Sequence, residues 1–362
     1  MHPRLVFHTG SFKGGSTAIQ SALASKSCDC AGCSILYPGI SPKEGPEKTR
    51  GQHGSLADAL LPSKTKRRRK HKQFTRVADH MRTIGADVTV ISAEKFEYVD
   101  PRALEACIRE YFPDFADHVR IVFYVRPHAE RLISGYAERV KHGLFLGDLE
   151  ELHRKTRTLN RPHQRGFFYH PRLWQWRDVF GSRLTVRPMI RDLLFRSDVV
   201  ADFFQQILDD RPFSLAPAAE KNSSPTLEDL AVVRHFHLTT RDLGLPPRLQ
   251  ERFGLKLAQA LTSPAHPGGT RLALHRSLAE DVLATYHEDA AALDRDFFTD
   301  SPMQTALRRA LEGAIPEPQA IDAARHLDAG QMRQVTAWAR TSADMLSRSH
   351  PDDASGGDRG TD

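Results

Sequence analysis

Short apolar runs recur along the first part of the chain and predict the strands of a parallel sheet. The runs are rich in Val, Ile, Phe and Tyr and most are continuously apolar, which is typical of strands buried on both faces. Helical patterns separate most of them, which favours a doubly wound α/β architecture with helices on both sides. We predict strands at Arg4 to His8, Ser34 to Tyr37, Asp87 to Ser92, Val119 to Val125 and Arg183 to Arg187.

The pattern changes after Thr226, where apolar residues follow at helix spacing and no further strand is indicated. We therefore predict an α/β core over residues 1–225 and a mostly helical C-terminal region over residues 226–348, packed on that core. Residues 349–362 are mostly Asp, Gly and Ser. Such a segment cannot offset the entropy lost on ordering, so we expect a disordered tail.

Charge favours anionic ligands, because the 362-residue chain carries a net charge of +6 with histidine neutral. The segment between Pro42 and Gln73 is rich in Pro, Gly and Lys and predicts a long mobile excursion. It ends in a basic run from Lys64 to Lys72, which is either a solvated charge run or a site for an acidic or sulfated glycan. Nucleic acid is disfavoured because no aromatic residues interleave this run.

The chain has no apolar stretch of eighteen residues and no signal-peptide pattern after Met1, so we expect a soluble cytoplasmic protein without a membrane span. Four cysteines are too few for a disulfide scaffold, and we expect no structural disulfides. Cys28, Cys30 and Cys33 lack a fourth ligand at metal spacing, which favours a loop over a zinc site.

The segment from His8 to Gln20 has the order strand, glycine-rich loop and helix that suits anion binding. Glycines allow a positive φ and close backbone approach, and hydroxyls at a helix start lie beside unsatisfied N–H groups. We call residues 10–17 the phosphate loop. Compared with the Walker A pattern, Ser16 occupies the lysine position, and the lysine stands three residues earlier at Lys13.

A second anion-binding element follows the apolar strand from Val119 to Val125. Arg126 stands at the carboxyl end of this strand, and Ser134 follows eight residues later on a predicted helix. Ligands of open α/β sheets bind beyond the carboxyl ends of the strands, so the phosphate loop and this element are expected to face one crevice. A guanidinium fork and a hydroxyl suit a phosphate dianion.

These two elements resemble the donor site of sulfotransferases that use 3′-phosphoadenosine-5′-phosphosulfate (PAPS). The family's Lys-x-Gly-[Thr/Ser]-Thr loop is matched by Lys13, Gly15, Ser16 and Thr17. An Arg at a strand end and a Ser eight residues later bind the 3′-phosphate in that family. The stretch from Phe167 to Pro188 is also similar to bacterial members, which extends the resemblance over roughly residues 4 to 230.

The resemblance implies a bacterial, soluble sulfotransferase with a P-loop-like fold and PAPS as its donor. The donor-binding residues that it implies are Lys13, Gly14, Gly15, Ser16, Thr17, Arg126 and Ser134. Sulfuryl transfer depends on positioning and electrostatic stabilisation, with charge developing on the bridging oxygen. Lys13 is the catalytic candidate for that oxygen, and no metal is expected.

The acceptor hydroxyl needs a general base, which is usually His or Glu in this family. His53 follows the second predicted strand, and Glu94 follows the third in a Ser-x-Glu stretch. Both stay open as catalytic candidates. We expect the acceptor to be a carbohydrate or a small metabolite, and nothing in the sequence sets the acceptor's identity or an oligomeric state.

The sequence leaves two other functions open. A non-catalytic PAPS- or polyanion-binding protein would keep the fold without a working base. A nucleotide kinase with a degenerate phosphate loop would need a Walker lysine and a Mg²⁺-binding Asp at a strand end. Neither the strand ending at Ser92 nor the strand ending before Arg126 supplies that Asp.

Overall fold

The computed structural model describes residues 3–10, 14–40, 51–61, 67–158, 166–209, 211–217, 225–262 and 269–349 of the chain, with the side chains of 67–70 and 346–349 left out. Lys13 and residues 350–362 of the predicted tail lie outside the described residues, whereas Ser349 ends a helix. Contacts between residues divide the chain into two compact units.

The first unit is built on a five-stranded, fully parallel sheet in the order β3-β4-β1-β5-β6. All five predicted strands form, and the predicted α/β class is confirmed. Their bounds are β1 Arg4–Gly10, β3 Ile35–Leu36, β4 Val88–Ser92, β5 Arg120–Val125 and β6 Leu184–Pro188.

The strand β1 lies at the centre of the sheet, at the point where the strand order reverses. From β1 the chain passes to β3 and β4 on one side and later to β5 and β6 on the other. In the register, His8 of β1 pairs with Ser92 of β4, and Gly10 of β1 pairs with Tyr124 of β5. The carboxyl ends of β4, β1 and β5 are therefore neighbours, and a ligand crevice is expected at this edge.

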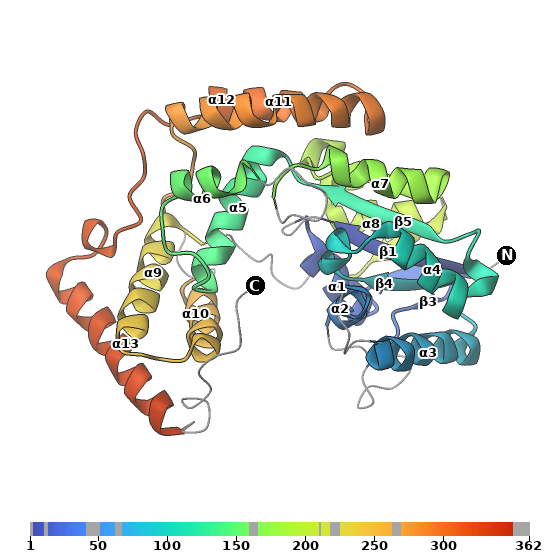
Figure 1. The fold of residues 1–362 in the computed structure, drawn as a ribbon, viewed down its shortest axis with the longest axis horizontal. Coiled ribbons are helices and arrows are strands. Elements are labelled where there is room, and N and C mark those ends of the chain that lie inside the picture. The colour runs from blue at the N-terminus through green and yellow to red at the C-terminus, as the bar shows by residue number, and fades with distance from the viewer. Residues whose placement is uncertain are drawn as a thin grey trace. The chain divides into compact units, whose positions relative to one another are not determined.

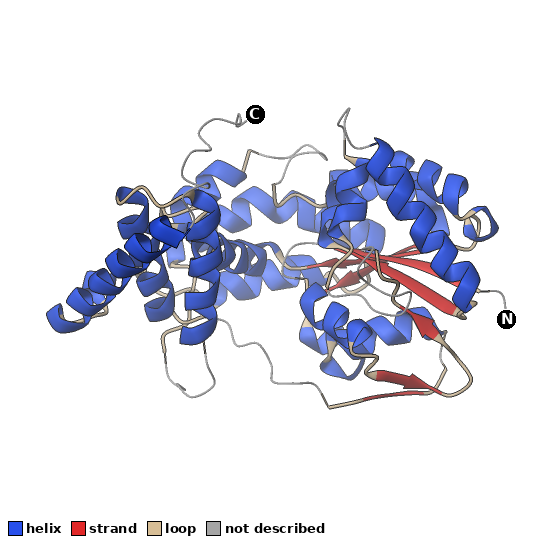
Figure 2. Cartoon of the chain, turned by 90° about the horizontal axis from the view of Figure 1, so that it is seen from below, coloured by secondary structure: helices blue, strands red, loops and turns tan. Residues whose placement is uncertain are grey.

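Helices cover both faces of this sheet, as Figures 1 and 2 show. Apolar side chains of α2, α3, α4 and α7 pack with Leu5 and Phe7 of β1 on one face. On the other face, α1 and α8 pack with Val6 of β1. Burial of these two apolar layers provides the main driving force for the fold of this unit.

The described residues contain the following helices: α1 Ser16–Ala24, α2 Gly54–Leu60, α3 Arg67–Ile84, α4 Pro101–Tyr111, α5 His128–Lys141, α6 Leu149–Thr156, α7 His170–Phe180, α8 Val199–Leu208, α9 Leu227–Asp242, α10 Pro247–Leu261, α11 Arg276–Phe297, α12 Pro302–Glu312 and α13 Ala329–Ser349. The 3₁₀ helices are η1 Glu94–Tyr98, η2 Pro113–Phe115, η3 Gly181–Arg183, η4 Arg191–Leu193, η5 Phe195–Ser197 and η6 Ala323–Arg325.

The prediction of a long mobile excursion between Pro42 and Gln73 was wrong for the residues that form α2 and the start of α3. Residues 42–50 and 62–66 lie outside the described residues. The apolar stripe of α3 begins only at Phe74 and continues through Val77 and Met81, all buried. The start of the helix could not be predicted from the sequence, because the basic residues before Phe74 have no amphipathic pattern. The part of the basic run from Lys64 to Lys66 lies outside the described residues.

The cysteine-rich segment was predicted as a loop, and this is wrong for part of it. Residues Cys28–Cys30 form β2, which pairs antiparallel with β7 (Phe213–Leu215) in a separate two-stranded sheet. Three residues are too few for a periodic signal, and the pairing partner lies far away in the sequence.

The two compact units do not follow one another along the chain. The first unit comprises Met1–Arg131, Thr156–Ala219 and Leu283–Arg309, and the second comprises Leu132–Lys155, Glu220–Val282 and Ala310–Asp362. In the described residues of the second unit the named elements are all helices, as predicted after Thr226, with one isolated bridge between His275 and Ile315. The helix α9 begins with a reciprocal cap between Thr226 and Asp229 and packs against α10 and α13.

Candidate functional site

The described part of the phosphate loop ends in a glycine whose conformation and surroundings both exclude a side chain. Gly15 caps α1 in the left-handed region, with φ 83° and ψ 4°. A Cβ atom there would lie 2.9 Å from either γ-carbon of Val199 and 3.1 Å from Cε of Met189. Glycine is therefore required for the chain to turn from the loop into α1 at this point.

Ser16 and Thr17 open α1, where backbone N–H groups have no partner within the helix. Ser16 is buried, whereas Thr17 is exposed. No side chain caps this end of α1 among the described residues. The predicted loop residues thus present a helix start of the kind that binds phosphate and sulfate groups. Gly14 is buried beside them, and Lys13 falls outside the described residues.

The loop's first glycine, Gly10, lies against the neighbouring strand. A Cβ atom on Gly10 would approach the carbonyl oxygen of Tyr124 to 3.1 Å. The hydroxyl of Tyr124 donates a hydrogen bond to the buried carboxylate of Asp202 on α8 at 2.7 Å. Arg187 of β6 also donates to both carboxylate oxygens of Asp202. These contacts fix the ends of β5 and β6 beside the loop.

Glu94 lies directly against the phosphate loop. The strand β4 ends at Ser92, and η1 begins two residues later with Glu94. The hydroxyl of Ser16 donates a hydrogen bond to Oε1 of Glu94. Glu94 is half-buried, so a carboxylate faces the helix start at which an anion would bind.

His53 also lies at this edge of the sheet, but both of its ring nitrogens contact backbone groups. Nδ1 accepts a hydrogen bond from the N–H of Ser92 at 3.0 Å, so Nε2 carries the proton and donates it to the carbonyl oxygen of Pro38 at 2.9 Å. The side chain is fully buried. This arrangement joins the start of α2 to the end of β4, and it favours a structural role.

A second buried histidine, His8, supports the same edge. Its Nδ1 lies 2.8 Å from the hydroxyl of Ser92, which also accepts a hydrogen bond from Gln20 of α1 at 3.1 Å. Burial lowers the pKa of His8 to about 3, so the ring is neutral at physiological pH. Ser92 therefore links β1, β4 and α1 without adding a charge to the site.

Arg126 follows β5 and is partly exposed, with 28% of its side chain accessible. Its Nε lies 3.4 Å from Oε2 of Glu130, one turn into α5. Its carbonyl oxygen accepts a hydrogen bond from the hydroxyl of Tyr169 at 2.8 Å. Ser134 is half-buried on the part of α5 that belongs to the second unit. Its pairing with Arg126 stays a prediction.

Sequence reasoning missed a buried ionic cluster at the same edge of the first unit. Glu97 of η1 accepts hydrogen bonds from Arg131 of α5, at 3.0 Å, and from Arg172 of α7, both on Oε1. All three side chains are at most 3% exposed. The spacing between the three residues in the sequence offers no signal for this cluster.

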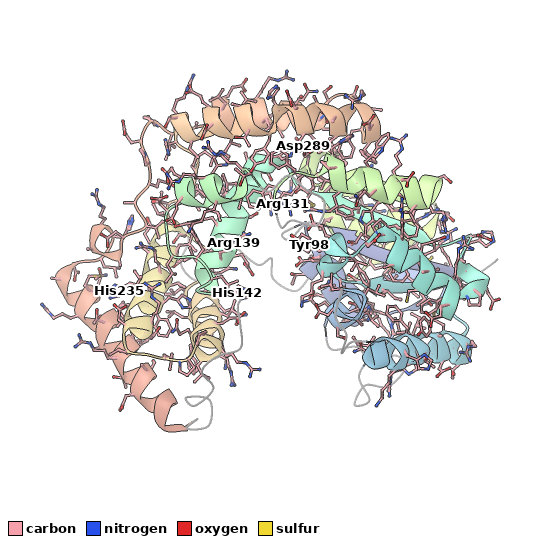
Figure 3. All side chains as sticks on the ribbon, viewed as in Figure 1. Tyr98, Arg131, Arg139, His142, His235 and Asp289 are labelled. Carbon is pink, nitrogen blue, oxygen red and sulfur yellow. The ribbon has the colours of Figure 1, made fainter. Side chains whose placement is uncertain are left out.

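A second missed feature is the carboxylate of Asp289 on α11, labelled with Arg131 and Tyr98 in Figure 3. It accepts hydrogen bonds from Nε2 of His128 at 2.8 Å and from the N–H groups of Tyr169 and His170 at 2.9 Å. Burial alone would raise the pKa of Asp289, but the contacts to His128 and to the two N–H groups hold it below its ordinary value. An ionised Asp289 thus anchors the start of α7.

The described residues contain no group of three or more His, Cys, Asp and Glu side chains that could hold a metal ion. In the cysteine segment, burial and the neighbouring thiols raise the pKa of Cys28 to about 12 and that of Cys33 to about 11. These thiols are therefore protonated at neutral pH. In the part of the chain that the structure describes, every helix is too short or too polar to cross a membrane.

No protein-family model and no curated protein matches the chain. The crystal structure of a sulfotransferase from Alicyclobacillus acidocaldarius is similar at a TM-score of 0.42 and 16% identity, covering 85% of this chain and 100% of that one. A TM-score below 0.5 does not establish a shared fold, so no residue role is transferred from that protein.

Proposed function

We propose that this chain is a PAPS-dependent sulfotransferase that transfers a sulfuryl group to the hydroxyl of a carbohydrate or a small metabolite. The observation that carries the proposal is the convergence of three polar elements on neighbouring strand ends. The phosphate loop follows β1, Glu94 follows β4 and Arg126 follows β5. These strands are adjacent, with β1 in the centre, and the strand order reverses there.

The donor side of the proposal rests on the phosphate loop and Arg126. The unsatisfied N–H groups at the start of α1 suit the 5′-phosphosulfate, and the bend at Gly15 lets the backbone approach it closely. The guanidinium of Arg126 suits a second phosphate, the 3′-phosphate that separates PAPS from ordinary adenine nucleotides. Lys13 is proposed for the bridging oxygen, on which charge develops during transfer.

Glu94 is the better candidate for the general base. Its carboxylate lies beside Ser16, at the proposed position of the sulfuryl group, whereas both ring nitrogens of His53 contact backbone groups. In the proposed reaction the acceptor oxygen forms a bond to sulfur, and the bond between sulfur and the bridging phosphate oxygen breaks. The acceptor proton passes to Glu94, and 3′,5′-bisphosphoadenosine (PAP) leaves with the electron pair.

The proposal is tested by ligand binding and turnover with the full chain. Calorimetry should show that PAP binds more tightly than AMP, which lacks the 3′-phosphate. Arg126→Ala should weaken PAP binding about 10- to 100-fold, the loss expected for a hydrogen bond to a charged group, and leave AMP binding within about twofold. The matched control is Arg102→Ala, which removes an arginine whose side chain is 77% exposed on α4.

Turnover is measured as PAP release from PAPS in the presence of carbohydrate and small alcohol acceptors. Equal affinity for PAP and AMP would contradict the proposed donor. Tight PAP binding without PAP release with any acceptor would point to a non-catalytic PAPS-binding protein instead.

A further inference from the structure

The proposed base stands on a short turn, which needs support from its surroundings. The 3₁₀ helix η1 has five residues, Glu94–Tyr98, and begins two residues after the end of the buried strand β4. Hydrogen bonds in 3₁₀ helices are weaker than in α-helices, and so short a turn has little stability of its own. The position of Glu94 therefore depends on contacts made by the other residues of η1.

Two of those contacts leave the rotation of the turn loosely defined. Phe96 is buried and packs edge-to-face on Phe7 of β1, with ring centroids 5.4 Å apart. This contact holds η1 against β1, but apolar packing is not directional and does not fix the rotation of the turn. Lys95 forms an ion pair with Asp58 of α2 at 3.0 Å, but both side chains are about one-third exposed or more. Exposed ion pairs of this kind contribute little.

Glu97 makes a buried, directional contact of η1. Residues three apart in a 3₁₀ helix lie on the same side of it, so Glu97 stands one turn below Glu94 on one face. Its Oε1 is held by Arg131 from the first turn of α5 and by Arg172 from the first turn of α7. A buried carboxylate between two guanidinium groups is fixed in direction as well as in place.

One of these arginines, Arg131, also connects the turn to the donor side. The guanidinium of Arg131 lies over the ring of Tyr169, 4.4 Å from its centroid. The hydroxyl of Tyr169 donates to the carbonyl oxygen of Arg126. Arg172 lies 5.1 Å from the ring centroid of Tyr98, the last residue of η1. The segments carrying the proposed base and the proposed 3′-phosphate arginine thus share one buried support.

We propose that Glu97, clamped by Arg131 and Arg172, is a positioning residue that holds η1 so that Glu94 stays against Ser16. The proposal rests on the proposed function in so far as Glu94 is taken to be the base. It adds a residue that touches neither donor nor acceptor and that acts through Glu94.

The test uses Arg172→Met, which leaves Glu97 paired one-to-one with Arg131, so that the buried carboxylate keeps a cationic partner. Hydrogen exchange followed by mass spectrometry should show the amides of residues 93–98 exchanging about tenfold faster, because the turn opens more easily. The kcat for PAP release should fall about tenfold through misplacement of the base. The KM for PAPS should stay within about twofold, since the phosphate loop is unchanged.

A second variant and a matched control separate positioning from general stability. Arg172→Lys keeps a cation near Glu97 but loses the planar contact with the ring of Tyr98, so exchange and kcat should lie between those of Arg172→Met and wild type. Arg183→Met removes another arginine paired with a glutamate, Glu105, at 3.3 Å. Arg183 lies at the amino end of β6, away from η1, and this variant should leave exchange at residues 93–98 and kcat unchanged.

Unchanged exchange at residues 93–98 in Arg172→Met would overturn the proposal. A lower melting temperature with wild-type kcat per folded molecule would do the same, because it would show a merely structural role. If wild-type protein releases no PAP, the proposed function fails, and the exchange measurement alone decides whether Arg172 supports η1.

Discussion

The hydroxyl of Ser16 donates a hydrogen bond to the carboxylate of Glu94, which joins the start of α1 to the turn after β4. Ser16 belongs to a helix start that favours anions, and Glu94 is itself an anion. A sulfuryl group placed at that helix start would lie within reach of the carboxylate. Under the proposed function, an acceptor hydroxyl would lose its proton at this pair.

Replacement of Glu94 should separate catalysis from donor binding. Glu94→Gln keeps an oxygen that can accept from Ser16 but removes the basic carboxylate. We expect kcat to fall by about 10²- to 10⁴-fold, the usual contribution of a general base, with PAP affinity within about twofold of wild type. Glu105→Gln, a carboxylate paired with Arg109 on α4, is the matched control. Turnover that survives in Glu94→Gln would exclude Glu94 as the base.

Replacement of His53 should affect stability rather than chemistry. In His53→Ala the N–H of Ser92 and the carbonyl oxygen of Pro38 lose their partner inside the fold. An unsatisfied buried polar group costs about 1–3 kcal/mol, so the free energy of unfolding in urea should fall by at least that amount. The kcat per folded molecule should stay within about threefold of wild type. A loss of kcat without a loss of stability would return His53 to the role of base.

Much of the first unit could be predicted from the sequence, because buried parallel strands are short, continuously apolar runs. The strand-to-helix turn at Gly15 was predictable because glycine is the residue that turns most easily into the left-handed region, whereas phosphate binding by this loop stays a prediction. The choice between His53 and Glu94 could not be made from the sequence. It depends on whether the ring nitrogens of His53 are occupied, and Ser92 and Pro38, which occupy them, belong to different segments.

The Glu97 cluster was not predictable at all. Its two arginines belong to α5 and α7 and follow Glu97 by 34 and 75 residues in the sequence. A single Glu in the sequence is predicted to lie on the surface, because buried charges are rare unless they are paired. The pairing arises only from the packing of three elements.

Gly15 should tolerate no side chain, and the prediction can be controlled within the same protein. Gly15→Ala places a methyl group in the left-handed region and within 2.9 Å of Val199. Gly85→Ala has a similar backbone angle, φ 62°, but nothing lies within 4 Å of the added atom. We expect Gly85→Ala to lose about 1–2 kcal/mol of stability from backbone strain alone.

The loss in Gly15→Ala should exceed that of Gly85→Ala, and PAP affinity should fall only in Gly15→Ala, because α1 must shift to relieve the contact. Urea unfolding and calorimetry measure the two effects. Equal stability losses in the two variants would show that Val199 moves aside without cost.

Asp289 should make the stability of the first unit depend on pH. Its pKa lies below the ordinary value of about 3.9, so the unfolded chain binds this proton more readily than the folded one. The stabilisation from Asp289 is therefore fully present above pH 5 and is lost as the pH falls through the ordinary pKa towards the lowered pKa of the folded state.

Asp289→Asn, which offers one oxygen to three donors, should lower the free energy of unfolding by about 3 kcal/mol at pH 7. Urea unfolding between pH 7 and pH 3 measures the free energy of unfolding of both proteins. The difference in this free energy between wild type and Asp289→Asn should become smaller as the pH falls. The control is Asp117→Asn, at a site that is 80% exposed, and its free energy of unfolding should match that of wild type at every pH. A difference between wild type and Asp289→Asn that stays constant with pH would mean that the charge of the Asp289 carboxylate does not stabilise the fold.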